Sequence, residues 1–215
     1  MASSSVARQP TLWIIAGPNG SGKSSAYGMA AVDEPAGSVW IINPDALAKR
    51  IQEEEAVEAT AANIAAVERM RVWLDASIDA YQTIGVETVL STDKYRSLVQ
   101  AARARGFQVS LIYVYLDTAD LNVERVELRV RKGGHAVDEA KIRSRRGRSF
   151  EQFAWFFAHA DTVDIFNNSG ARPELVLTKR GGLISVLDTM IPDMVAAVDR
   201  AVPGFAAVYD EDDDD

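Results

Sequence analysis

The residues best suited to chemistry lie near the start of the chain, in the stretch Gly17-Pro-Asn-Gly-Ser-Gly-Lys-Ser24. Gly17, four residues, then Gly22-Lys23-Ser24 is the P-loop spacing, in which glycines let backbone N–H groups turn toward one phosphate. Lys23 would reach the β and γ phosphates, and the Ser24 hydroxyl would bind Mg²⁺. The alternative is a glycine-rich turn without a ligand. We favour a nucleotide site made of Gly17, Pro18, Asn19, Gly20, Ser21, Gly22, Lys23, Ser24 and Ser25.

Polar residues also follow other apolar runs, where open α/β sheets bind ligands. Ile41-Ile-Asn43-Pro44-Asp45 ends the second run. The Asp45 carboxylate is suited to take a proton from an acceptor hydroxyl or to hold the metal through water. The alternative is that Asp45 only caps the next helix. We favour the functional role, because both can be true at once. Asp117, after a later run, offers the same choice between metal and cap, and there we favour the cap.

A third apolar run ends in polar residues that a buried strand holds only when they are paired. Each is either a substrate contact or a partner in a local hydrogen bond. These residues are Glu87, Thr88, Ser91 and Thr92.

An arginine-rich segment between residues 125 and 148 stands out in an otherwise acidic chain. Arg125 and Arg129 share one helical face, as do Arg145 and Arg148. Gly133-Gly134 separates the two pairs and predicts a lid whose arginines offset the charge that builds up in phosphoryl transfer. The alternative is a solvated basic face. His135 beside the glycines is a ligand contact or a structural residue.

The elements that must position these residues alternate between strand and helix patterns. We expect strands at residues 12–16, 39–42, 86–90, 109–116, 163–166 and 175–178. We expect helices at residues 23–31, 44–49, 55–83, 95–105, 119–132, 139–158 and 184–198. This order predicts the α/β fold of a P-loop NTPase or kinase, a three-layer sandwich with a central, mainly parallel sheet and an arginine-rich helical lid.

Length and composition indicate the number of domains and exclude several classes of protein. The 215 residues suit one domain, which we place at residues 11–205, after a disordered lead-in (1–10) and before an acidic tail (206–215). The net charge of −8 argues against general nucleic-acid binding, and the absence of cysteine excludes disulfides and thiolate metal sites. No apolar run approaches the about 20 residues that cross a bilayer, and the start lacks a secretory signal pattern. We therefore expect a cytoplasmic protein without a membrane partner.

The ordered set of these motifs resembles the zeta toxin family, in its compact branch of predicted ATPases or kinases. The resemblance covers residues 12–168. It rests on the P-loop, Ile42-Asn-Pro-Asp45, Glu87-Thr-Val-Leu-Ser91, Arg125 with Arg129, Gly133-Gly-His135, the run 143–149 and Phe166-Asn-Asn168-Ser169. The large substrate-binding insertions of the best-known zeta toxins are missing.

The resemblance implies an ATP- and Mg²⁺-dependent kinase that phosphorylates a sugar hydroxyl of a nucleotide sugar such as UDP-N-acetylglucosamine, and that a small antitoxin protein holds inactive. It implies that Asp45 is the base and that Arg145 and Arg148 are lid arginines, with Arg146 open because the family often has an aromatic residue there. Acceptor contacts would come from Asn43, Asp45, Glu87, Thr88, Ser91, Thr92 and His135, and nucleotide contacts from Arg125 and Asn168 besides the P-loop. The rival hypothesis is a P-loop ATPase or regulatory nucleotide-binding module without a small-molecule acceptor.

Overall fold

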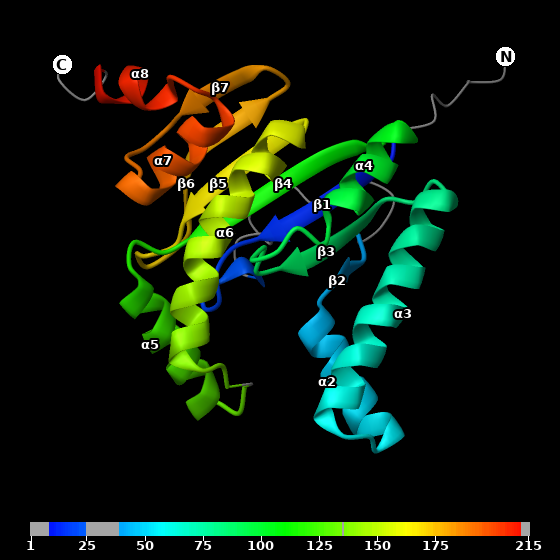
Figure 1. The fold of residues 1–215 in the computed structure, drawn as a ribbon. Coiled ribbons are helices and arrows are strands. Elements are labelled where there is room, and N and C mark those ends of the chain that lie inside the picture. The colour runs from blue at the N-terminus through cyan, green and yellow to red at the C-terminus, as the bar shows by residue number, and fades with distance from the viewer. Residues whose placement is uncertain (1–8, 25–38, 135, 212–215) are drawn as a thin grey trace, which may run out of the picture.

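The computed structural model describes residues 9–24, 39–134 and 136–211, and its centre is a seven-stranded sheet of order β2-β3-β1-β4-β5-β6-β7 (Figure 1). The first five strands in this order run parallel, and β6 and β7 are antiparallel to their neighbours. This confirms the mainly parallel sheet. The strands are β1 (Thr11–Ala16), β2 (Ile41–Ile42), β3 (Ile84–Thr88), β4 (Gln108–Tyr115), β5 (Thr162–Asn167), β6 (Glu174–Arg180) and β7 (Leu183–Val186).

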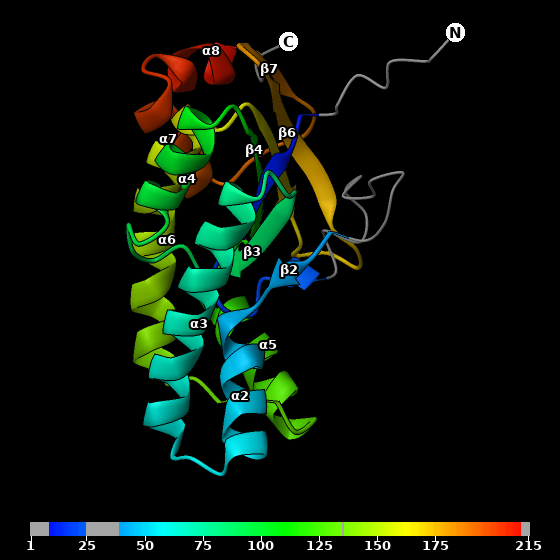
Figure 2. The same cartoon turned by 90° about the vertical axis from the view of Figure 1, so that its right-hand side faces the viewer.

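Seven helices occur in the described residues: α2 (Pro44–Glu55), α3 (Ala59–Asp79), α4 (Arg96–Ala104), α5 (Ala119–Arg131), α6 (Glu139–His159), α7 (Pro192–Ala201) and α8 (Phe205–Glu211). Helices α3, α4, α6 and α7 cover one face of the sheet (Figure 2). They bury a large apolar cluster that includes Phe153, Phe156 and Phe157 of α6. The other face carries a smaller cluster around Ile15 and Ile112. Lys23 and Ser24 are helical, and residues 25–38 lie outside the described residues.

The helix expected at residues 55–83 is α3, which begins later, at Ala59, and ends earlier, at Asp79. Helix α2 extends past its expected end to Glu55, where Ala56 adopts a left-handed conformation with φ of 51° and stops it. Helix α3 then runs back along α2, and the two pack through small and branched side chains such as Ala48, Ile51 and Ala62. The result is a helical hairpin that extends below the sheet on the right of Figure 1, while α5 and the first half of α6 extend below it on the left.

The helix expected at residues 184–198 is wrong in its first half. Gly181, with φ of 59°, turns the chain into strand β7, which pairs with β6. The helix starts only at Pro192, which has a fixed φ and no N–H and therefore suits the first helical position. Local propensity did not reveal that residues 183–186 would extend the sheet.

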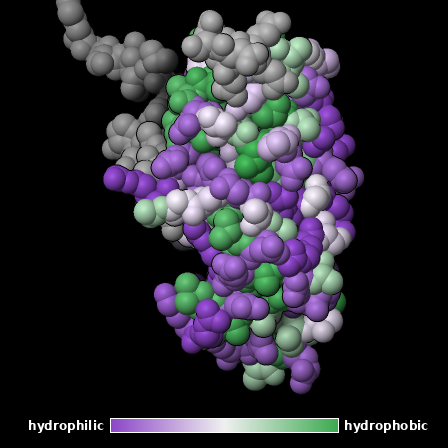
Figure 3. Space-filling view, turned by 90° about the vertical axis from the view of Figure 1, so that its left-hand side faces the viewer, coloured by the Kyte–Doolittle hydropathy of each residue, from purple (hydrophilic) through white to green (hydrophobic). Residues whose placement is uncertain are grey.

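The end of the described chain is more ordered than an acidic tail suggests. Helix α8 packs on α7, and the Tyr209 hydroxyl accepts a hydrogen bond of 2.7 Å from the Met190 amide. On the side of the molecule opposite to Figure 2, hydrophilic residues predominate and hydrophobic ones form small groups (Figure 3). None of the described helices is apolar over the length that a bilayer requires.

Candidate functional site

A cavity of about 710 Å³ lies at the carboxyl end of the parallel strands, between the α2–α3 hairpin and the α5–α6 pair. Residues from the P-loop, α2, α3, the loop after β3 and the lid all line it. Those that the sequence predicted are Asn19, Gly20, Lys23, Asn43, Asp45, Glu87, Thr88, Ser91, Thr92 and Arg145. Arg129, which the sequence predicted as a lid arginine, lines it as well. Lys49 and Lys94 also line it, and sequence reasoning did not single them out as site residues.

The P-loop lysine is buried and held by its own loop. Lys23 Nζ donates hydrogen bonds of 2.9 Å to the Gly17 carbonyl and 3.2 Å to the Pro18 carbonyl. Burial lowers the pKa of Lys23, while the nearby carboxylates of Glu87 and Asp45 act in the opposite direction. Gly17 is required here, because a Cβ at this position would lie 2.0 Å from the Val114 carbonyl oxygen.

Two asparagines from later segments of the chain form hydrogen bonds with backbone carbonyls of the P-loop. Asn168 Nδ2 donates a hydrogen bond of 2.8 Å to the Ser21 carbonyl, and Asn122 Nδ2 donates one of 2.7 Å to the Asn19 carbonyl. Both side chains are buried. A Cβ at Gly22 would lie 2.2 Å from Asn168 Nδ2, so the loop packs tightly against this amide. Their contacts in the structure are with the loop backbone.

Asn122 was missed in the sequence, although a signal for it exists. It lies four residues before Val126, and the two are the buried residues of α5. A polar side chain on the buried face of a helix needs a partner. That signal does not say which partner, because the P-loop lies 103 residues away along the chain.

Ser24, the last residue of the P-loop motif, lies beside Glu87. Ser24 Oγ donates a hydrogen bond of 3.3 Å to Glu87 Oε2, since β3 pairs with β1 and brings Glu87 opposite Ile15. The resemblance assigned Glu87 to the acceptor, but the structure places it beside the predicted metal ligand. Hydroxyl and carboxylate oxygens are the donors that Mg²⁺ prefers, so this pair fits the ion. Ser25 lies outside the described residues.

Asn43, not Asp45, caps α2. Asn43 Oδ1 accepts hydrogen bonds from the amides of Asp45 (2.9 Å) and Ala46 (3.2 Å). Asp45 is exposed at the cavity, and its charge acts on both Lys23 and Lys94. The carboxylate is therefore placed to meet a ligand.

The three neighbouring arginines of α6 have different surroundings. Arg145 lines the cavity, whereas Arg148 is exposed and donates a hydrogen bond of 2.8 Å to Ser144 Oγ. Arg146 is buried: it bonds to the carbonyls of Leu116 and Asp117 and forms an ion pair of 2.8 Å with Asp193. The structure thus brings Arg145 to the cavity and leaves Arg146 and Arg148 out of it.

The remaining lid residues lie nearby. Arg129, Gly133 and Gly134 line the cavity, and Arg125 Nη2 lies 3.4 Å from the Ser169 carbonyl oxygen, beside the P-loop. His135 lies outside the described residues.

The loop after β3 is locked by local hydrogen bonds. Leu90 is buried with a left-handed φ of 58°, an unfavourable conformation for a leucine, and its amide donates to Thr88 Oγ1 at 3.0 Å. Ser149 Oγ of α6 donates to the Val89 carbonyl at 2.7 Å. For Thr88 the structural alternative is therefore realised, although it also lines the cavity.

Asp117 does not cap α5, and that prediction is wrong. Thr118 is the cap, with its hydroxyl accepting from the Leu121 amide at 3.2 Å. Asp117 Oδ1 instead accepts a hydrogen bond of 2.9 Å from Asn167 Nδ2.

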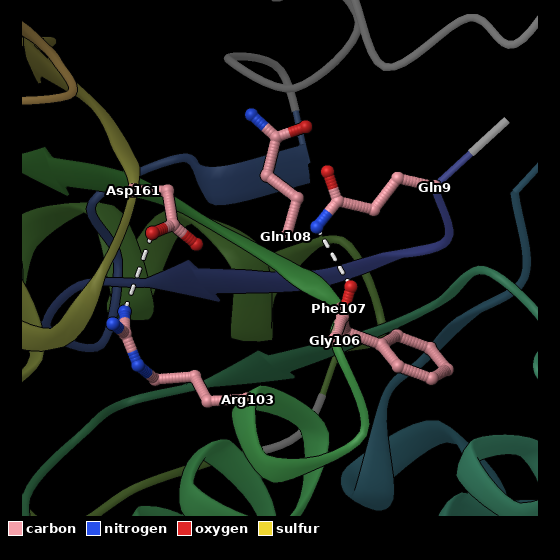
Figure 4. Close-up of a pocket in the computed structure, with 6 residues that line it drawn as sticks. All are labelled: Gln9, Arg103, Gly106, Phe107, Gln108 and Asp161. Carbon is pink, nitrogen blue, oxygen red and sulfur yellow. Dashed lines mark hydrogen bonds and ion pairs between the residues drawn. The ribbon is translucent and has the colours of Figure 1, made fainter.

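A second cavity, of about 420 Å³, lies near the start of β4 (Figure 4). Three of its polar side chains have partners: Arg103 pairs with Asp161 at 3.3 Å, Asp161 Oδ2 accepts from the Val109 amide, and Gln9 Nε2 donates to the Gly106 carbonyl. These contacts join the start of the chain to the sheet, so a structural role accounts for them.

Several solved structures share this fold. The complex AvrRxo1-ORF1:-ORF2 with ATP has a TM-score of 0.66 at 17% identity and aligns with 95% of this chain, which spans only 64% of that one. The PezAT chromosomal toxin–antitoxin system of Streptococcus pneumoniae has a TM-score of 0.58 at 16% identity, covering 75% of this chain and 68% of that one. A putative kinase from Chloroflexus aurantiacus has a TM-score of 0.50 at 18% identity, covering 65% of this chain and 78% of that one.

Sequence comparison gives the family. An uncharacterized protein of Haemophilus influenzae is 26% identical over 141 residues, which cover 62% of this chain and 96% of that protein. The sequence pattern of the family described as Zeta toxin matches residues 2–190. The chain therefore belongs to the zeta toxin family.

Proposed function

We propose that the protein is an ATP-dependent kinase that transfers the γ-phosphoryl group to a hydroxyl of a small molecule, in the class of nucleotide sugars such as UDP-N-acetylglucosamine. The observation that carries this proposal is the shared cavity, which holds the P-loop lysine and the exposed carboxylate of Asp45 together. Membership of the zeta toxin family supports the same conclusion.

Each group of residues in the cavity has its own role in the proposed reaction. The P-loop amides and Lys23 bind the phosphates of ATP, and Ser24 with Glu87 would hold Mg²⁺, which supplies charge neutralisation at the phosphates when bound. Asp45 accepts the proton of the acceptor hydroxyl. At the same time the hydroxyl oxygen forms a bond to the γ phosphorus, and the bond between the γ phosphorus and the β-phosphate oxygen breaks. Arg145 faces the transferring group from the lid and offsets its charge.

The test is transfer itself. Incubation with labelled ATP, Mg²⁺ and a panel of nucleotide sugars, followed by mass analysis, should give a product heavier by one phosphoryl group. Asp45→Asn keeps the shape of the side chain and removes the base, so we expect turnover to fall by at least a hundredfold, within the range for general-base catalysis. Binding of ATP should be unchanged.

Asp93→Asn is the matched control, because Asp93 is also an exposed aspartate that follows a parallel strand, β3, and it does not line the cavity. Its turnover should equal that of the wild type. Normal turnover by Asp45→Asn on the true acceptor would exclude Asp45 as the base. Phosphate release that no acceptor changes would indicate an ATPase instead.

We further propose that the protein acts as the toxin of a toxin–antitoxin pair. One of the solved structures that share its fold is described as the PezAT toxin–antitoxin system, and the family itself is named for toxins. A small antitoxin protein would then be its partner.

A further inference from the structure

The loop after β3 contributes to the wall of the cavity and contains a residue in an unfavourable backbone conformation. Leu90 is 1% exposed and has a left-handed φ of 58°, where the Cβ of a leucine is strained. The next two residues, Ser91 and Thr92, line the cavity. A strained backbone persists only where surrounding contacts fix it. The contacts that fix Leu90 therefore also set where Ser91 and Thr92 lie.

One peptide unit in this loop is held at both ends. The unit joins Val89 to Leu90, and its planarity couples the orientation of its C=O and N–H groups. The Leu90 amide donates a hydrogen bond of 3.0 Å to Thr88 Oγ1, and the Val89 carbonyl accepts one of 2.7 Å from Ser149 Oγ of α6. Because rotation of this unit changes φ of Leu90, the two bonds together stabilise the left-handed conformation. The bond from Ser149 comes from outside the loop.

The hydroxyl of Ser149 is itself fixed by the sheet. It is fully buried, and its single proton is used in the bond to the Val89 carbonyl. The Tyr113 hydroxyl, 2.9 Å from Ser149 Oγ, is therefore the donor in that second contact. Burial raises the pKa of Tyr113, so its hydroxyl keeps the proton that it donates. The Tyr113 ring packs against Phe150 and Phe153, with ring centres 5.9 and 4.7 Å away.

Ser149 also lies on the part of α6 that carries Arg145. The two residues are four positions apart, so they share one face of the helix and are one turn apart. Arg145 lines the cavity, whereas Ser149 is buried beneath it. One buried hydroxyl thus connects the helix of the lid arginine to the loop after β3.

We propose that Ser149 is a positioning residue for the acceptor, and that its hydrogen bond to the loop after β3 keeps Ser91 and Thr92 in place to contact that molecule. This inference rests on the proposed function, because it assigns the loop to the acceptor of the kinase. Without the bond from Ser149, the peptide unit before Leu90 is free to rotate and the strained conformation relaxes. The acceptor then has to order the loop when it binds, which weakens its binding.

The first test measures transfer by Ser149→Ala, which removes the hydroxyl and leaves the Cβ. The KM for the acceptor should rise about tenfold, the effect of one buried hydrogen bond, and the KM for ATP should not change. Ser110→Ala is the matched control. Ser110 is also a buried serine and bonds to Thr162 Oγ1 at 2.8 Å, but it lies near the start of β4, away from the cavity. A purely structural role of Ser149 predicts that both variants lose stability and keep the acceptor KM of the wild type.

The second test needs neither ATP nor an acceptor. Hydrogen exchange of the free protein, followed by mass analysis of peptides that contain residues 89–92, reports the order of the loop. Exchange should be about tenfold faster in Ser149→Ala than in the wild type and unchanged in Ser110→Ala. If Ser149→Ala does not fold, Ser149→Cys takes its place in both tests, since a thiol is similar in size and only a weak donor.

The outcomes separate the positioning role from the kinase. In a protein that transfers phosphate, a normal acceptor KM or a normal rate of loop exchange in Ser149→Ala would overturn the inference and leave the kinase standing. Faster loop exchange without transfer to any acceptor would support the role of Ser149 in holding the loop and reject the kinase. Normal exchange without any transfer would reject both.

Discussion

Arg145 and Arg146 are neighbours in α6 but serve different parts of the molecule. Successive residues of a helix point in directions about 100° apart, so one guanidinium reaches the cavity while the next is buried against the end of β4. The Arg146 guanidinium also lies 4.7 Å from the ring centre of Phe150. We infer a role for Arg145 in the reaction and for Arg146 in stability.

Replacing each arginine by methionine separates the two roles. Arg146→Met leaves the buried Leu116 carbonyl and the partly buried Asp117 carbonyl without their charged donor, and should lower the free energy of unfolding by about 2–3 kcal/mol. Arg145→Met should keep the stability of the wild type and lower kcat by about a hundredfold. Urea unfolding and the transfer assay measure the two effects. Arg148→Met is the control and should change neither, because its side chain is exposed. Equal loss of stability by both Arg145→Met and Arg146→Met would contradict this division.

Lys23 makes the stability of the unliganded protein depend on pH. Burial lowers its pKa in the folded state below the ordinary value of 10.5, so the unfolded chain binds more protons between these two values. The free energy of unfolding contributed by this group should therefore rise with pH through that window and level off above 10.5. Urea unfolding of wild type and Lys23→Met across the alkaline range isolates the slope. A wild-type profile parallel to that of Lys23→Met would show that the lysine is not desolvated.

At the scale of elements, α5 and the end of β5 hold the P-loop in shape. Asn122 and Asn168 fix two of its carbonyls by hydrogen bonds that need no bound nucleotide. The loop is therefore preorganised, and its order depends on segments that follow it by a hundred residues or more.

Asn122→Ala should weaken ATP binding about tenfold, since a lost buried hydrogen bond costs about 1–1.5 kcal/mol and frees the loop. Calorimetric titration with ATP and Mg²⁺ gives the affinity, and thermal unfolding shows that the fold persists. Gln100→Ala, on the exposed face of α4, serves as the comparison and should bind ATP normally. An unchanged ATP affinity in a folded Asn122→Ala protein would show that ATP binding does not depend on the hydrogen bond between Asn122 and the P-loop.

At the scale of the whole molecule, two helical pairs enclose one reaction site. The α2–α3 hairpin supplies Asp45 and one wall, and α5 with α6 supplies the arginines and the opposite wall. Ser149 of α6 bonds to both Tyr113 of the sheet and the loop after β3, so the lid helix and the acceptor loop share one support.

Expression in a bacterial host should arrest growth if the proposed kinase is a toxin. Lys23→Ala and Asp45→Asn should both relieve the arrest at equal protein levels, because one removes the phosphate contact and the other the base. Growth curves with immunoblots measure the effect. Arrest that persists in both variants would mean that toxicity, if present, has another origin.

The local pattern of residues determined the donor half of the site. The P-loop, the strand before Asp45, the strand that holds Glu87 and the arginine-rich helices are encoded within short stretches. Motif spacing, apolar runs and charge were enough to find them. The boundaries that they missed depend on contacts between distant segments: β7 forms because β6 offers it an edge, and α2 continues because α3 packs along it.

Only the tertiary structure decided which candidates meet. In the structure, Ser24 forms a hydrogen bond with Glu87, and Asn43 caps α2. Arg145 lines the cavity, whereas Arg146 and Arg148 do not. It also revealed Lys94 and Asn122, which no motif contains. The reason is physical: sequence spacing sets the chemistry of a side chain and the face it occupies, whereas burial, strand register and neighbouring charges come from segments far away in the chain.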